Sequence, residues 1–416
     1  MKNRLIESAP ADNPSAGGYI SDVIGSSGEK NGYFGTVSYI YRFFEILFLS
    51  AFLIYLLFSA IGNAGEVTYS NMEYIVRNFA MKLEENSETA TEIIYSPDSS
   101  MSCGLYGNGI AVCGNSGLTV FSATGRKTCS ISFDLEDPVM RTSSKYILVF
   151  DNGRNYYCIF NTFSRVYEKE TDYPVRGACV AGNGWYAIIT GSDMYTSCVE
   201  VYDSNFKIRA RYSKTGYALT ADFDPEGKKI IIASVDMDDS GNYVTELSTY
   251  VIGADETEST AMIDGDIPLA CRFTENYIGV VCGNSFYSYS TDLFPLNVLE
   301  YGARSLGDFA FSDSSVCLVF ENDTSAINRT RSAEIYTVSG SIIGNYETSG
   351  NISSVCMSGS YAYMLVDDVP TLLTGSGTYE YRFTENIVPE KILAYAEGHI
   401  YICCSSAAYV IEFETQ

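Results

Sequence analysis

The sequence predicts an all-β protein, an eight-bladed β-propeller, preceded by one transmembrane helix and a short amphipathic helix. Three observations support this prediction. A strand–turn–strand phrase recurs eight times, with a period of about 40 residues that is typical of propeller blades. The 34 Tyr, 22 Phe and 35 Gly favour sheets and tight turns. One long apolar stretch, residues 46–65, carries no charge.

Residues 46–65 read ILFLSAFLIYLLFSAIGNAG and predict the membrane-spanning part of a helix over residues 38–65. At about 1.5 Å rise per residue, such a stretch covers a hydrocarbon core of about 30 Å. A buried helix of a soluble protein and a cleaved signal peptide are the alternatives. We prefer the membrane span, because little else in the chain is helical enough to pack around a buried helix. The preceding segment is also far longer than the n-region of a signal peptide.

The distribution of basic residues predicts the orientation of this span in the cell membrane. It is preceded by Lys2, Arg4, Lys30 and Arg42. This bias favours a cytoplasmic N-terminus and an extracytoplasmic C-terminal part, in a single-pass protein whose lipid contact is made by residues 46–65.

Two further segments flank the predicted span. Residues 1–37 are rich in Gly and Ser and predict a disordered cytoplasmic tail. Residues 66–90 form a linker in which Ser70 and Glu73 fit a capping box, followed by apolar residues at helical spacing. The linker therefore predicts a short amphipathic helix, which packs under the propeller, lies at the membrane surface or joins a partner helix.

The repeated phrase assigns residues 91–416 to the propeller. Each copy holds a polar turn and an apolar strand, as in GNGIAVCG at 107–114 and AEGHIYICC at 396–404. One small sheet cannot bury both faces, whereas sheets stacked radially cover each other. The last blade is one strand short, and the unassigned strand Thr91–Pro97 is expected to supply it and close the ring. A seven-bladed ring with one phrase as an insertion is the alternative.

Charge and composition exclude several kinds of function. The net charge of −25 argues against nucleic-acid binding, which requires Lys and Arg to displace counterions. His399 is the single His, which argues against a Ser-His-Asp triad or a His-based metal site. The 12 Cys follow the span and fall mostly in strand-like runs, which favours free buried thiols. Disulfides are the alternative, with Cys103–Cys113 and Cys271–Cys282 as the pairs whose spacing permits it.

Candidate site residues are acidic. Asp222, Asp264 and Asp308 stand near predicted blade entrances and are candidates to face the channel. Glycosidases use paired carboxylates, so three converging acids are compatible with glycan hydrolysis.

A second acidic cluster lies in the segment DMDDSGN and contains Asp236, Asp238 and Asp239. Three carboxylates before a Gly make a weak candidate for calcium. The pattern lacks the final ligand of a calcium loop, because Leu247 stands where Glu is needed. A hairpin turn with solvated acids is therefore the preferred interpretation.

The chain resembles a family of membrane-anchored propeller proteins of Clostridia-type bacteria, a domain of unknown function. The resemblance is carried by the order of tail, span, linker VTYSNMEYIVRNF and first strand IIYSPDSS. The ring is similar to WD40-like and quinoprotein-like propellers. Trp185 is the single Trp, whereas cofactor-dependent quinoproteins carry several, so no cofactor is expected. The resemblance implies fold and topology and no catalytic residue.

The sequence as a whole predicts a non-catalytic binding scaffold displayed outside the cytoplasm, with a protein or envelope component as its partner at the ring face or channel. A carbohydrate-active enzyme of the cell surface, hydrolase or lyase, is the alternative. A sensor that signals through the span is a third option, but the tail carries no motif that supports it.

Overall fold

The computed structural model describes residues 32–60 and 91–413, apart from 255, 324–328 and 384–386. Residues 1–31 of the predicted tail (1–37) and the predicted amphipathic helix in 66–90 lie outside the described residues, whereas residues 32–37, predicted to be disordered, belong to a helix. The chain consists of two compact units, residues 1–69 and 70–416.

The first unit contains helix α2 (Gly32–Ala60). The sequence correctly predicted a helix here, although it begins six residues before the predicted boundary at residue 38. Side chains are described for residues 37–53 of it. Within the part of the chain that the structure describes, no helix is long and apolar enough to cross a membrane. Residues 61–65 of the predicted span lie outside the described residues.

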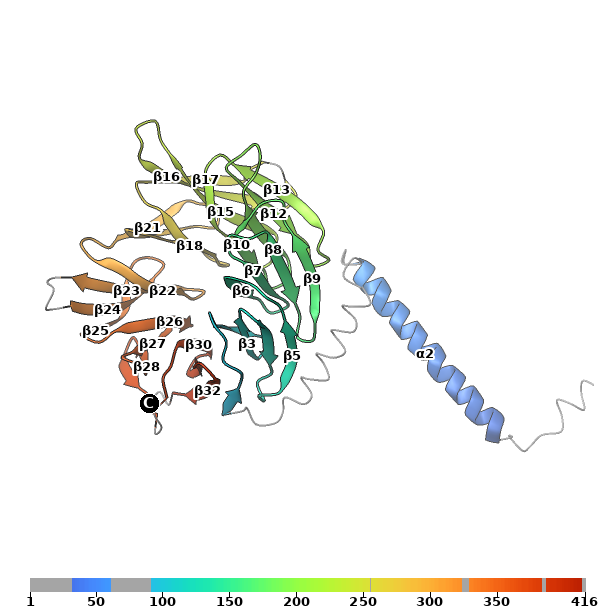
Figure 1. The fold of residues 1–416 in the computed structure, drawn as a ribbon. Helices are drawn as coiled ribbons and strands as arrows, with labels where there is room; N and C mark the ends of the chain where they lie inside the picture. The colour runs from blue at the N-terminus through green and yellow to red at the C-terminus, as the bar shows by residue number, and fades with distance from the viewer. Residues whose placement is uncertain (1–31, 61–90, 255, 324–328, 384–386, 414–416) are drawn as a thin grey trace, which may run out of the picture. The chain divides into compact units, whose positions relative to one another are not determined.

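The second unit is a ring of eight four-stranded antiparallel sheets, counted over the described residues (Figure 1). The eight-bladed prediction is therefore confirmed and the seven-bladed alternative is wrong. Blades 1 to 4 follow the chain in order. Blade 1 consists of β2 (Ser102–Tyr106), β3 (Gly109–Gly114), β4 (Gly117–Phe121) and β5 (Lys127–Ser132). Blade 2 consists of β6 (Pro138–Thr142), β7 (Ile147–Asp151), β8 (Tyr156–Phe160) and β9 (Arg165–Glu170). Blade 3 consists of β10 (Val175–Val180), β11 (Tyr186–Thr190), β12 (Ser197–Tyr202) and β13 (Ile208–Lys214). Blade 4 consists of β14 (Tyr217–Phe223), β15 (Lys229–Met237), β16 (Tyr243–Val251) and β17 (Ser259–Asp264).

Blades 5 to 8 complete the ring. Blade 5 consists of β18 (Pro268–Phe273), β19 (Ile278–Cys282), β20 (Ser285–Tyr289) and β21 (Pro295–Glu300). Blade 6 consists of β22 (Ser305–Phe311), β23 (Ser315–Asp323), β24 (Arg329–Thr337) and β25 (Ile342–Thr348). Blade 7 consists of β26 (Ile352–Ser358), β27 (Tyr361–Val366), β28 (Val369–Thr374) and β29 (Gly377–Glu380). Blade 8 consists of β30 (Lys391–Ala396), β31 (His399–Cys403), β32 (Ala407–Glu412) and, from the other end of the propeller, β1 (Glu92–Ile94).

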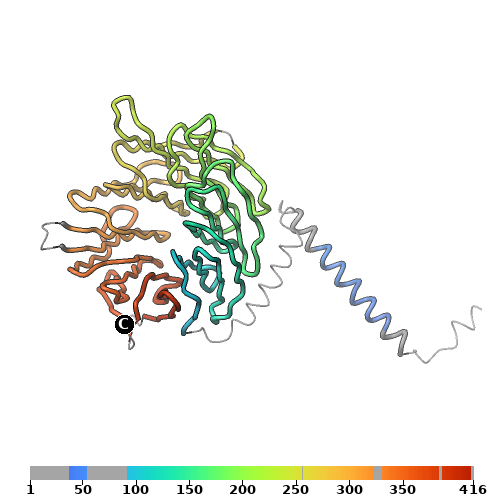
Figure 2. Tube along the Cα trace, viewed as in Figure 1, coloured from blue at the N-terminus to red at the C-terminus, as the bar shows by residue number. Residues whose placement is uncertain are grey.

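Closure by β1 confirms the predicted role of Thr91–Pro97. Strand β1 pairs antiparallel with β32, with Ile93 opposite Ala408. In Figure 2 the blue start of the propeller lies beside the red end of the chain. The Tyr95 hydroxyl donates to the carbonyl oxygens of Cys404 and Ala407, at 2.6 and 2.9 Å, and so fastens this closure with side-chain bonds. Strand β1 is therefore the outermost strand of blade 8 and covers the outer edge of β32.

The core lies between the blades. Eight clusters of buried apolar residues each join two neighbouring blades, so that every blade is covered on both faces. The apolar strand of each repeated phrase is the second strand of its blade; β7, β11 and β19 are buried along their whole length. This burial explains why the phrase recurs, since a strand between two neighbouring sheets must be apolar on both sides.

The twelve thiols are free. The strand register explains why the two candidate disulfides do not form. Cys103 stands opposite Val112 rather than Cys113, and Cys271 stands opposite Val280 rather than Cys282. Small buried thiols therefore fill space in tight sheets, as the preferred interpretation of the sequence predicted.

The shared strand polarity gives the ring two distinct faces. First strands of neighbouring blades contact each other around the centre (Figure 1). We call the face at which the first strands begin the upper face; the turns between second and third strands also lie there. The lower face is where the first strands end, and it carries the turns that join first to second strands.

Candidate functional site

The channel contains a cavity of about 710 Å³ formed by the first strands of blades 2 to 5, which are β6, β10, β14 and β18. Three arginines enter it from three different strands: Arg141 of β6, Arg176 of β10 and Arg272 of β18. Asp222 of β14 is the one acidic residue in this lining. The wall of the channel is therefore basic in a chain whose net charge is −25.

Asp222 lies on the first strand β14 and links two blades. Its Oδ2 atom accepts a hydrogen bond from the Phe273 backbone N–H of blade 5 at 3.0 Å. The same oxygen lies 3.6 Å from the Arg272 guanidinium, and the Asp222 side chain is 17 % exposed. Burial raises the pKa of Asp222 to about 6, against the opposing effect of Arg272 and the N–H donors. One oxygen of this carboxylate is thus occupied by the neighbouring blade.

Asp308 has the same role two blades further on. It lies on β22, where its Oδ2 accepts from the Val355 N–H of blade 7 at 3.1 Å and its Oδ1 from the Phe309 N–H at 2.8 Å. Burial raises its pKa, while these donors and Lys391 oppose the shift. Blade 5 stands between blades 4 and 6, so the first strands that carry Asp222 and Asp308 are not neighbours.

Asp264 does not face the channel, which corrects the prediction for this residue. It ends β17, the outermost strand of blade 4, where it stands opposite Val244 and is exposed. The sequence pattern around Asp264 does not distinguish a first strand from a fourth, because both border a turn between blades.

The predicted acidic cluster at Asp236, Asp238 and Asp239 forms a hairpin turn. The Asp238 carboxylate accepts the backbone N–H groups of Ser240 and Asn242, both at 2.8 Å. These bonds lower the pKa of Asp238. In the described part of the chain no group of three or more His, Cys, Asp or Glu side chains is placed to hold a metal ion. The three acids therefore serve as turn and surface residues.

A second cavity, of about 490 Å³, opens toward the lower face and is lined by Asp222, Asp224, Glu275 and Asp313 among others. Asp224 accepts the N–H groups of Lys228 and Lys229, both at 2.7 Å, and so shapes its turn. This cavity shares Thr142, Val180, Asp222 and Arg272 with the larger one. The two volumes adjoin at the Asp222–Arg272 pair, with arginines on one side and carboxylates on the other.

The two thiols that line the larger cavity are not activated. Cys179 and Cys271 both line the larger cavity. Burial raises the pKa of Cys271 to about 12 and also raises that of Cys179. Because the thiolate is the nucleophilic form, both groups stay neutral and behave as small apolar residues.

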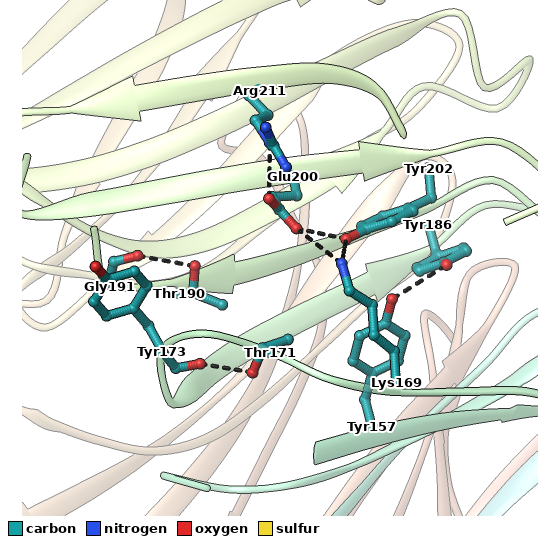
Figure 3. Close-up of polar contacts among 10 residues, drawn as sticks. All are labelled: Tyr157, Lys169, Thr171, Tyr173, Tyr186, Thr190, Gly191, Glu200, Tyr202 and Arg211. Carbon is teal, nitrogen blue, oxygen red and sulfur yellow. Dashed lines mark hydrogen bonds and ion pairs between the residues drawn. The ribbon is translucent and has the colours of Figure 1, made fainter. Parts of the chain in front are cut away.

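Charged side chains that the sequence analysis missed join the blades further out (Figure 3). Glu200 on β12 accepts from Arg211 at 2.8 Å, receives the Tyr202 hydroxyl, and lies 3.8 Å from Lys169 of blade 2. Lys169 also donates to the Tyr202 hydroxyl at 2.7 Å. Beneath this group the rings of Tyr186 and Tyr202 are stacked, with centroids 4.7 Å apart. The ring of Tyr157 in blade 2 lies 5.9 Å from that of Tyr186 between centroids, so charge and aromatic packing together join blade 3 to blade 2.

The same arrangement recurs in blade 4. Lys214 of blade 3 donates to Glu246 at 2.8 Å, and the Ser248 hydroxyl donates to the same glutamate. The Lys214 ammonium group also donates to Ser248 at 2.7 Å.

The most buried of these ion pairs, Arg304–Glu334, lies in blade 6. Arg304, in the connection from blade 5, reaches both oxygens of Glu334 at 2.8 and 2.9 Å and lies 3.8 Å above the ring of Phe320. Tyr336 donates its hydroxyl to Glu334.

We call these three groups the interface clamps: Lys169–Glu200, Lys214–Glu246 and Arg304–Glu334. A sequence signal for them exists, since each glutamate lies on a third strand two residues before Tyr or Ser, in VEVY, TELS and AEIY.

The fold and the channel together define a closed eight-bladed β-propeller with a basic central cavity. The chain belongs to a family of unknown function, DUF5711, whose model matches residues 82–408. This match agrees with the predicted resemblance to a propeller family of unknown function. No curated protein matches the sequence.

Solved structures share the fold. BamB from Moraxella catarrhalis has a TM-score of 0.55 at 10 % identity, covering 79 % of this chain and 98 % of its own. The computationally designed Ika8 protein has a TM-score of 0.60 at 8 % identity, covering 78 % of this chain and 100 % of its own. At these identities the likeness concerns the fold alone, and it agrees with the predicted similarity to quinoprotein-like propellers.

Proposed function

We propose that this protein is a non-catalytic binding scaffold, anchored in the cell membrane by residues 46–65, that displays the propeller outside the cytoplasm and captures a protein or envelope component on its upper face. One observation carries the non-catalytic part. The two acids on first strands, Asp222 and Asp308, accept backbone N–H groups of the next blade. Carboxylates used in this way hold the ring together rather than attack a substrate.

Exposed apolar side chains on the upper face support a protein partner. Met194 and Tyr195 lie in the turn between β11 and β12, and Met237 and Tyr243 stand opposite each other near the tip of the β15–β16 hairpin. Met194 is 87 % exposed and Met237 is 60 % exposed. The hairpin is long, with nine residues in each strand. Methionine and tyrosine adapt well to protein surfaces and are favoured at interfaces.

The test uses the full-length chain in its native membrane. Cross-linking followed by mass spectrometry should identify one partner for the wild type. The double variant Met194→Ser/Met237→Ser should lose that partner, because its apolar contacts are removed. Phe294→Ser is the matched control, since Phe294 is 69 % exposed in a turn of the lower face. Retention by the double variant, or equal loss in the control, would contradict capture on the upper face.

Helix α2 supports the anchoring part of the proposal. Its described side chains include exposed Ile46, Phe48, Leu49 and Phe52, with Phe48 71 % exposed. Apolar side chains of this size require a lipid or protein environment. Carbonate extraction should leave the chain in the membrane pellet, and protease added to intact cells should digest the propeller. Release by carbonate, or full protection from protease, would refute the proposed location.

The alternative, a carbohydrate-active enzyme, is favoured by one observation. The pKa of Asp222 is raised to about 6 by burial, as expected of a general acid, and Glu275 and Asp313 line the same lower cavity. Asp222→Asn should then abolish glycan release from purified cell envelope, with Asp264→Asn as a control on the outer strand. Glycan release by the wild type that disappears in the first variant alone would establish the enzyme and refute the scaffold.

A further inference from the structure

The arginines of the channel cavity have few partners among the described residues. Among the described residues, the Arg141 side chain makes one hydrogen bond, from its Nη1 to the carbonyl oxygen of Met140 at 3.2 Å. Arg176 lies with its guanidinium 5.6 Å from the ring centre of Tyr217. No carboxylate among the described residues forms an ion pair with either. Burial in the channel also lowers the pKa of Arg141.

Arg272 differs from Arg141 and Arg176 because it has one ion-pair partner. It lies 3.6 Å from Asp222, a single long contact, and its side chain is 50 % exposed. Asp222 uses the same oxygen for the backbone of Phe273. Arg272 therefore keeps donors free to reach into the cavity, since a guanidinium group carries five N–H donors.

The position of these arginines is unexpected on electrostatic grounds. The chain has 51 acidic and 26 basic residues, so carboxylates are available to pair with almost any cation. Elsewhere the fold does pair them, as in the interface clamps. Arg141 and Arg176 are both exposed to solvent, so their donors are open to a ligand, and a guanidinium group binds an oxyanion through charge-assisted hydrogen bonds.

We propose that the channel cavity binds a small ligand carrying at least two carboxylate or phosphate groups, held by Arg141 and Arg176 with Arg272 as a third contact. Guanidinium groups bind both kinds of oxyanion through paired hydrogen bonds. The cavity of about 710 Å³ has the size of a small-molecule site. The inference goes beyond the scaffold function and does not depend on it.

The two cavities also indicate the direction of access. Asp224, Glu275 and Asp313 line the lower cavity and repel an anion that approaches from that side. Leu219 and Leu269, at the upper ends of β14 and β18, line the larger cavity and are more than 40 % exposed. The ligand therefore enters from the upper face and stops at the Asp222–Arg272 pair.

Calorimetry on the full-length chain tests this proposal with two probes, citrate for carboxylates and pyrophosphate for phosphates. At least one probe should bind, and the stronger binder identifies the chemistry. Arg141→Gln and Arg176→Gln should each weaken binding about tenfold or more, the value of a charged hydrogen bond. Raising the salt concentration should also weaken binding. Arg165→Gln, on the outer strand β9, is the matched control and should leave affinity unchanged.

Two outcomes overturn the proposal. The first is that neither probe binds the wild type. The second is that a probe binds equally well to the wild type and to both glutamine variants. Thermal unfolding checks that the variants fold. Should Arg141→Gln fail to fold, Arg141→Lys keeps the charge but loses the paired donors, and unchanged binding by this variant would also refute the assigned role of Arg141.

Discussion

The cations at the blade interfaces and the cations of the channel are placed in opposite ways. Lys169, Lys214 and Arg304 each reach a glutamate on the neighbouring blade, at 3.8, 2.8 and 2.8 Å. Arg141 and Arg176, on first strands, have no ion pair with any described residue. The difference separates two uses of charge in one fold. Paired charges keep blades in register, whereas unpaired charges are available to a molecule from outside.

The largest effect is expected at the most buried interface clamp. Arg304→Met should lower the free energy of unfolding by about 2–3 kcal/mol, because a buried carboxylate loses its partner. Glu334 would lose two hydrogen bonds, and its side chain is 10 % exposed. Urea unfolding followed by the fluorescence of Trp185, the single Trp, measures this loss.

The control for that experiment is an exposed pair. Arg382 lies 3.0 Å from Glu380 with 79 % of its side chain exposed. Arg382→Met should cost less than about 0.5 kcal/mol, as exposed ion pairs do. Equal losses for the two arginine variants would show that burial does not decide the strength of these clamps.

The next largest effect is the contribution of Asp222 to the pH dependence of the free energy of unfolding. Its pKa is raised to about 6 by burial, above the value of about 3.9 for an unfolded Asp. Between these values the folded state binds more protons than the unfolded state, so this group's contribution to stability falls as pH rises from about 4 to about 7 and is constant above. The fall amounts to about 2 kcal/mol.

Asp222→Asn removes this titration. The free energy of unfolding of the variant, minus that of the wild type, should therefore increase from about pH 4 to about pH 7 and then level off. Urea unfolding at four pH values across this range measures the difference. Two curves that run parallel would mean that Asp222 ionises in the channel as readily as in water.

A smaller effect is expected at the clamp between blades 2 and 3. Lys169→Met should cost about 1 kcal/mol, because Glu200 keeps Arg211 at 2.8 Å and the hydroxyl of Tyr202. Replacing Arg211 as well should cost more than the sum of the single losses, since the second change leaves Glu200 without a cation. Additive losses in a double-mutant cycle would show that the two cations act independently.

The smallest change in stability is expected for an arginine of the channel. Arg141→Gln should change the free energy of unfolding by less than about 0.5 kcal/mol, because no ion pair with a described residue is lost. The same urea experiment measures it. A loss as large as that of Arg304→Met would make Arg141 a structural cation, and the distinction between clamp and channel would fail.

The fold was predictable because the buried strands require apolar residues, and these residues recur at regular intervals in the sequence. Each second strand lies between two blades and must be apolar, so the phrase recurs once per blade and its count gives the number of blades. The strand at Thr91–Pro97 could be assigned because blade 8 was one strand short. Period and strand count are thus local properties of the chain.

The site was less predictable because it depends on which strand reaches the centre. Asp222 and Asp264 both border turns, yet one lies on a first strand and the other on a fourth. Arg141, Arg176 and Arg272 are isolated basic residues in apolar strands, and only the ring brings them to one cavity. The glutamates of the clamps had a signal, E-x-Y or E-x-S on third strands, that becomes visible once the blades are aligned.

The pairing of β1 with β32 has a kinetic consequence. The two strands are joined by a loop of about 310 residues, whose closure costs about 5 kcal/mol of chain entropy. Three residue pairs and the Tyr95 hydroxyl bonds fasten this seam. So few contacts cannot offset that cost until seven sheets are already stacked and hold the ends near each other. We therefore expect the pairing of β1 with β32 to form last during folding. Until it forms, the chain exposes unpaired edges of β1 and β32, with which a neighbouring copy can pair.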